Sequence, residues 1–163
     1  MAYDHYPRAT NAELGSTAYS QGLVGQTVTT LTNAQVLALR ATPITLVAAP
    51  GAGYFLEFVS AAFVLNYGGT QYTESNDNLA VKYVNGSGSA ASATVECTGF
   101  IDVAGDAITL GHPITTEPLI TAAGELSNAV LCLHNTGDGE FGGGHASSTL
   151  KVFCNYRIHA TAL

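Results

Sequence analysis

β-Branched and aromatic residues fall in short runs along this chain, and turn residues separate the runs about every ten positions. The clearest alternation covers Leu150–Ala160, where Leu, Val, Cys, Tyr, Ile and Ala occupy one face and mostly polar residues occupy the other. Such a pattern is typical of a strand with a buried face and a wet face. We predict further strands at residues 43–48, 54–67, 79–84, 94–97, 108–110 and 129–135.

One short helix is predicted over residues 32–39. Thr32 and Gln35 have the spacing of a capping box, and the apolar residues that follow supply a buried face. Pro43 ends this segment, because a proline biases the residue before it toward extended geometry.

Two of the strands carry further expectations. The segment 54–67 is too long to stay flat and is expected to bend near residues 60–62, where the side chains are small. The segment 129–135 is the expected hairpin partner of the last strand, which would place Cys132 nearly opposite Cys154. A disulfide between them stays open as an alternative, but reduced, buried thiols are favoured in a cytosolic protein.

The sum is about seven or eight short strands, one helix and no alternation of strands with helices, which indicates an all-β fold. We predict an antiparallel β-sandwich or jelly roll over residues 27–163. Residues 1–26 are rich in tyrosine and glycine without a strong period, and we assign them to an extended N-terminal arm.

Two glycine-rich segments look like nucleotide-binding loops. LVAAPGAG, residues 46–53, leads into a strand where a phosphate loop needs a helix, so it is expected to turn the chain. GDGEFG, residues 137–142, also leads into a strand, and its Asp138 and Glu140 would repel a pyrophosphate, so a hairpin loop is expected. A calcium site at these two carboxylates is the open alternative; we expect no cofactor and no metal.

No grouping of residues predicts an enzyme. The five histidines lack paired metal-ligand spacing, and His134 and His159 fall in predicted strands. No nucleophile elbow is present, and the spacing of Asp102, Asp106 and Glu117 is typical of loop carboxylates.

The charge balance excludes some partners and favours others. Five Lys and Arg against twelve Asp and Glu give a net charge of −7, which would repel nucleic acid. No apolar run reaches the roughly 20 residues of a membrane span, so no membrane partner is expected. Charged residues make up only 10% of the chain, whereas a free surface is typically about 25–35% charged. This low value favours a surface that faces another protein.

Several segments resemble a group of small virion proteins of tailed bacteriophages and prophages. They are TPITLVAAPGAG, LNYGGTQYT, NLAVKY, NTGDGEFGGG and LKVFCNYRI, beginning at residues 42, 65, 78, 135 and 150. The resemblance implies a capsid decoration, or cement, protein that forms a homotrimer on the outer surface of the capsid and clamps neighbouring major capsid protein subunits, often through an N-terminal arm. It supplies no catalytic residues.

We therefore expect a protein made in the host cytoplasm and located in the virion, with the major capsid protein and its own copies as partners. The residues expected at the interface lie in the arm, whose aromatic side chains suit burial against a partner: Tyr3, His5, Tyr6, Pro7, Arg8 and Tyr19. The alternative is a receptor- or glycan-binding module of a tail or fibre, which would bind through residues 85–92 and 136–148.

Overall fold

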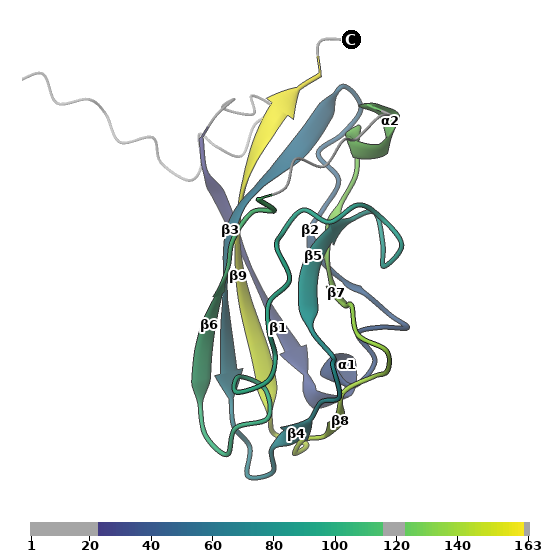
Figure 1. Cartoon of the computed structure of the whole chain (residues 1–163). Helices are drawn as coiled ribbons and strands as arrows, with labels where there is room; N and C mark the ends of the chain where they lie inside the picture. Colours follow the sequence, from purple (N-terminus) through teal and green to yellow (C-terminus); the bar gives the residue numbers. More distant parts are fainter. Residues whose placement is uncertain (1–22, 116–122, 162–163) are drawn as a thin grey trace, which may run out of the picture.

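The structure, a computed structural model, describes residues 23–115 and 123–161 (Figure 1). These residues form an all-β fold in which two antiparallel sheets face each other, which confirms the predicted sandwich. The first sheet has the order β1-β9-β3-β6, with β1 Gly25–Thr32, β9 Thr149–Ala160, β3 Tyr54–Asn66 and β6 Ala107–Gly111. The second has the order β2-β7-β5, with β2 Ile44–Val47, β7 Leu131–Asn135 and β5 Leu79–Tyr83.

Four small elements complete the described part of the chain. The strands β4, Tyr72–Thr73, and β8, Gly142–Gly143, pair with each other at one end of the sandwich. The helix α1, Asn33–Val36, follows β1, and α2, Ala123–Leu126, precedes β7. The described chain begins and ends at the opposite end of the sandwich from β4 and β8 (Figure 1).

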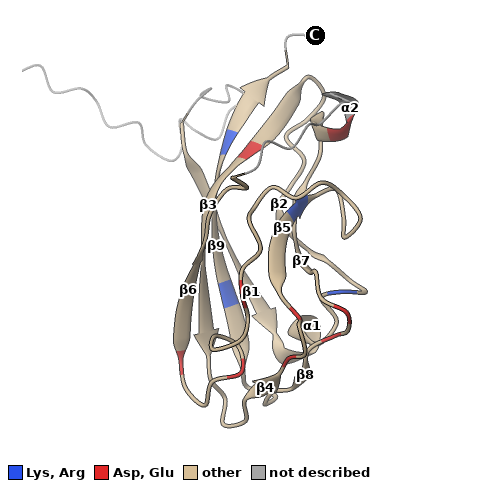
Figure 2. Ribbon diagram, viewed as in Figure 1, with Lys and Arg blue, Asp and Glu red and all other residues tan. Residues whose placement is uncertain are grey.

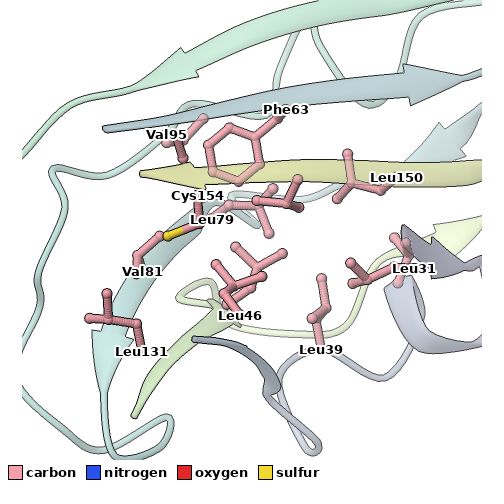
Figure 3. Close-up of a cluster of buried hydrophobic side chains, with 14 of the residues drawn as sticks. Leu31, Leu39, Leu46, Phe63, Leu79, Val81, Val95, Leu131, Leu150 and Cys154 are labelled. Carbon is pink, nitrogen blue, oxygen red and sulfur yellow. The ribbon is translucent and has the colours of Figure 1, made fainter. Parts of the chain in front are cut away.

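The core lies between the two sheets. Because side chains alternate along a strand, one face of each sheet points inward, and these faces are apolar. Phe63, Leu150 and Cys154 of the first sheet face Leu46, Val81 and Leu131 of the second (Figure 3). In β9 the inward residues Leu150, Val152 and Cys154 are fully buried, as the alternation predicts, whereas Lys151 on the other face is exposed.

The strand β3 bends where small side chains allow it. Its pairing with β9 shifts by one residue between Phe58 and Ser60, next to the predicted bend. The extra residue, Val59, keeps Phe58 and Ala61 on the buried face although they are three positions apart. The bulge thus lets one long strand keep its apolar side toward the core.

The helix α1 confirms the predicted capping box but is shorter than predicted. The Gln35 N–H donates to Thr32 Oγ1 at 3.4 Å, and the Thr32 N–H donates to Gln35 Oε1 at 2.9 Å. The helix ends at Val36, and the chain continues in turns to residue 42. In that segment Leu39 is still fully buried, so the apolar positions that predicted a longer helix pack into the core from a turn.

The segment 46–53 turns the chain, as predicted. Gly51 and Gly53 have φ angles of +104° and +79°, a region that favours glycine, and the Tyr54 N–H donates to the Gly51 carbonyl at 3.2 Å. The strand β3 follows at once.

The predicted hairpin between residues 129–135 and the last strand is wrong. β7 lies between β2 and β5, whereas β9 lies between β1 and β3 in the other sheet. The segment 136–148 therefore crosses between the sheets instead of closing a hairpin. Both strands bury an apolar face, so the period of two does not distinguish a pair within one sheet from two strands in facing sheets.

Cys132 and Cys154 are accordingly not opposite each other. Cys154 lies in the core, between Thr27 and Ala61 of the neighbouring strands, whereas Cys132 alternates with Leu131 and Leu133 and points to the other side of the second sheet. Both thiols and that of Cys97 are free and buried. Burial raises the pKa of the Cys97 and Cys154 thiols to about 12, so both are protonated at neutral pH.

The predicted strand at 94–97 is also absent from the described residues. Only single bridges tie this region to β5, from Val95 to Leu79 and from Ala90 to Lys82. The segment 90–95 therefore runs beside β5 without forming a regular ladder.

Candidate protein interface

The interface residues predicted from the sequence, Tyr3, His5, Tyr6, Pro7, Arg8 and Tyr19, lie outside the described residues. Only residues 23–26 of the proposed arm are described. Gly25 and Gln26 belong to β1, opposite Tyr156 and Asn155 of β9. The sandwich therefore begins at least two residues before the predicted boundary at residue 27.

The outer face of the four-stranded sheet carries an apolar surface that the sequence analysis did not predict. Pairing aligns two rows of residues across β1, β9, β3 and β6: Val28, Phe153, Ala62 and Leu110, and beside it Thr30, Lys151, Val64 and Ile108. We define the outer apolar face as the six apolar residues of these rows. Ile108 is 71% exposed, Leu110 59% and Val28 53%. Large apolar side chains that gather on a surface usually mark a binding site.

Local packing forces Ile108 and Leu110 outward. The other side of β6 faces the core, where a Cβ on Gly111 would lie 2.9 Å from the Phe63 ring. This close approach leaves no room for a side chain at position 111 on the inner side. The alternation of the strand then places Ile108 and Leu110 on the outer side.

β6 also lacks the usual protection of an edge strand. Among the described residues it pairs only with β3, and its sequence, AITLG, has no charged residue. Natural sheets commonly place Lys, Pro or a bulge at such an edge to prevent association. An uncharged edge that also exposes two large apolar side chains is suited to contact with another chain.

The outer apolar face carries almost no charged side chains. Neither row contains an acidic residue, and Lys151 is their one charged member. Most of the described Asp and Glu lie toward the end of the molecule that carries β4 and β8 (Figure 2). The acidic surface that would oppose contact between copies is thus concentrated away from the middle of this sheet.

A polar cluster on β3 and β9 lies beyond the outer apolar face, toward the end of the sandwich opposite β4 and β8 (Figure 1). Arg157 Nη1 lies 3.2 Å from Glu57 Oε1, His159 Nε2 lies 2.7 Å from Glu57 Oε2, and the His159 ring stacks on Phe55. Burial alone would raise the pKa of Glu57, but the hydrogen bonds from His159 and Arg157 outweigh it and hold this pKa below its usual value. The cluster resembles the polar rim that surrounds the apolar centre of many interfaces.

The other candidate residues that the structure describes lie in strands or bind backbone N–H groups in loops. His134 and His159 lie in β7 and β9, which confirms the prediction that they belong to strands. Asp106 Oδ1 accepts the Tyr67 N–H at 2.8 Å, and Asp102 Oδ1 accepts the Gly99 N–H at 2.7 Å, so both are loop carboxylates, as predicted. Glu117 lies outside the described residues.

The two carboxylates of the loop 137–142, those of Asp138 and Glu140, have different surroundings. The two oxygens of Glu140 accept the N–H groups of Arg40, at 2.9 Å, and Ala41, at 2.7 Å, so this side chain ties the loop to the segment after α1. Asp138 is exposed. In residues 23–115 and 123–161, no three His, Cys, Asp or Glu side chains come together to hold a metal ion.

The described residues thus offer an apolar sheet face with a polar edge as the surface best suited to a partner.

No helix in the described part of the chain is long and apolar enough to cross a membrane. No family model, no curated protein and no solved structure matches the chain.

Proposed function

We propose that this chain is a structural virion protein that decorates a phage capsid and stabilises it by binding across major capsid protein subunits, as a homotrimer. The observation that supports this best is the outer apolar face on a charge-poor, all-β domain. Copies of the chain meet through this face, since its two rows contain no acidic side chain and the neighbouring Asp106 lies only at its margin, beside Val64 and Ile108. The arm then remains available to the capsid.

The connectivity of the strands is compatible with this role. Apart from the β4–β8 pair, the seven main strands alternate between the sheets: β1, β3, β6 and β9 belong to one, and β2, β5 and β7 to the other. The bridged segment 90–95 lies beside β5, in the place of an eighth strand. Two facing sheets of four strands connected in this order form a jelly roll, an architecture used in viral capsid proteins. We therefore propose a jelly roll with one incomplete strand.

Decoration needs no chemistry at the site. A protein that binds only the expanded capsid lattice stabilises that lattice by mass action. A trimer strengthens the attachment, because the second and third copies bind at high effective concentration once the first is docked. Three modest contacts therefore suffice where one would dissociate.

The arm is the part of the chain assigned to the capsid contact. Deleting residues 1–22 should leave the sandwich folded, since β1 and its pairing with β9 are kept from Gly25 onward. We expect a loss of binding to capsids, measured by co-sedimentation of the purified chain with capsids that lack it. Deleting residues 1–26 is a less clean test because it also removes Gly25 and Gln26 from β1.

The truncated chain must have the thermal unfolding midpoint of the full chain for the comparison to hold. Attachment at full strength by a folded, truncated chain would refute the role of the arm.

A receptor- or glycan-binding module of a tail or fibre is the second candidate. One observation favours it: residues 85–87, part of the loop proposed for such binding, line a hollow in the surface together with Arg40 and His134. This hollow lies on the second sheet, away from the outer apolar face.

A further inference from the structure

A surface hollow of about 480 Å³ lies over the outer side of the three-stranded sheet. It is lined by three segments that are distant in the sequence: Arg40, Ala41 and Pro43 between α1 and β2, Asn85, Gly86 and Ser87 after β5, and His134 of β7. Its volume is within the range of about 300–1,000 Å³ that is typical of small-ligand sites. Nothing in the proposed decoration role uses it.

Positive charge gathers here in a chain that is strongly acidic. Arg40 lines the hollow, and Lys82 adjoins it, with Nζ donating to the Gly86 carbonyl at 2.6 Å. Within the described residues the two ion pairs both use Glu57, so neither Arg40 nor Lys82 is paired with a carboxylate. Two of the five basic residues of a chain with net charge −7 therefore lie at or beside this hollow, and the charges of both act on His134.

The Glu140 carboxylate contacts this segment but does not form an ion pair with the side chain of Arg40. Both oxygens of Glu140 accept backbone N–H groups, those of Arg40 and Ala41, and Glu140 does not line the hollow. Glu140 holds the segment that carries Arg40, and its negative charge also acts on His134, where the two positive charges of Arg40 and Lys82 oppose it. The hollow thus keeps an excess of positive charge, which favours a small anion.

His134 forms a buried wall of the site. It is only 8% exposed, its Nδ1 has no hydrogen-bond partner among the described residues, and a Cβ on Gly86 would collide with its ring. Burial lowers the pKa of His134, and the charges of Lys82 and Arg40 act in the same direction; together they outweigh the opposing effects of the Arg40 backbone and Glu140 and favour the neutral ring. A neutral imidazole leaves the positive charge of the site to Arg40 and Lys82.

Neutral hydrogen-bonding groups lie beside the charges. Asn85 Oδ1 accepts the N–H of Ser87 at 2.9 Å and its hydroxyl at 2.7 Å. The Asn85 amide nitrogen and the Ser87 oxygen have no other contact of this kind among the described residues, so a donor and an acceptor remain for a ligand. Hydroxyl groups match such a pair, and Pro43 and Ala41 supply an apolar wall for a ring.

We propose that this hollow binds an acidic sugar, whose carboxylate lies between Arg40 and Lys82 and whose hydroxyls bond to Asn85 and Ser87. The planar guanidinium of Arg40 is suited to two parallel hydrogen bonds with a carboxylate. An Asp or Glu side chain from a protein partner would supply the carboxylate but would leave Asn85 and Ser87 unused. This inference does not depend on the virion role.

The test uses the full chain and the methyl glycosides of N-acetylneuraminic acid and glucuronic acid, with binding followed by NMR or calorimetry. We expect at least one of them to bind, and to bind more tightly than acetate, methyl glucoside or a glutamate-rich peptide. Arg40→Gln and Lys82→Gln should each weaken binding about tenfold, the usual effect of losing a charged hydrogen bond.

Lys151→Gln is the matched control, because it removes an exposed lysine from the other sheet and should leave binding unchanged. Arg40 is exposed, so Arg40→Gln should keep the thermal unfolding midpoint of the wild type. The inference is overturned if neither acidic sugar binds at millimolar concentration, if acetate or the peptide binds as tightly, or if Lys151→Gln weakens binding as much as Arg40→Gln. None of these results bears on assembly or on capsid attachment.

Discussion

Replacing Ile108 and Leu110 together by Asp should convert the proposed homotrimer to a folded monomer. Both side chains are mostly exposed in the single chain, so their replacement should change the free energy of unfolding of the monomer by no more than about 0.5 kcal/mol per site. In the assembled state each carboxylate would be buried against apolar residues, which is costly for an unpaired charge. We expect the association constant between copies to fall by a factor of about 100 or more.

Sedimentation velocity across a range of concentrations measures this change directly. Val84→Asp is the matched control: Val84 is also apolar and 49% exposed, but it follows β5 in the other sheet. It should leave the association unchanged. A double variant that sediments as the wild type does would exclude the outer apolar face as the contact between copies.

Phe63→Ala should destabilise the fold by about 3–5 kcal/mol, the usual cost of removing a buried aromatic side chain. Phe63 is fully buried between the sheets, and its ring packs against the position of Gly111, which has no side chain to fill the resulting cavity. Such a loss is a large share of the roughly 5–15 kcal/mol that is typical of the free energy of unfolding of a single domain. Urea unfolding at one fixed protein concentration measures it.

The control is the next residue of the same strand. Val64 points to the outer face and is partly exposed, so Val64→Ala should cost no more than about 1 kcal/mol. Equal losses in the two variants would contradict the orientation of β3, and with it the assignment of the outer apolar face.

The elements that the sequence predicts best are those whose pattern is local. The alternation of β9 and the length of β3 are visible in a few consecutive residues, and the capping box of α1 needs only Thr32 and Gln35. The sequence pattern does not predict β1, because its inward positions include Thr27 and Thr29 and the segment GQTVTTLT has no clear apolar face. Tertiary pairing with β9 overrides that weak pattern.

The candidate sites could not be predicted for a related reason. The outer apolar face exists only once Val28, Phe153, Ala62 and Leu110 are aligned by pairing across four strands. The hollow likewise joins Arg40, Asn85 and His134 from three separate segments. Alternation along the chain indicates which side of a strand is buried, but it indicates neither the sheet to which the strand belongs nor its neighbours.

The copy number of this chain in purified virions, relative to the major capsid protein and measured by quantitative mass spectrometry, tests the central claim most directly. Lattice-wide decoration predicts a copy number of the same order as that of the major capsid protein. A few copies per particle would contradict it, since a tail or fibre component, and not a decoration protein, is present at that level.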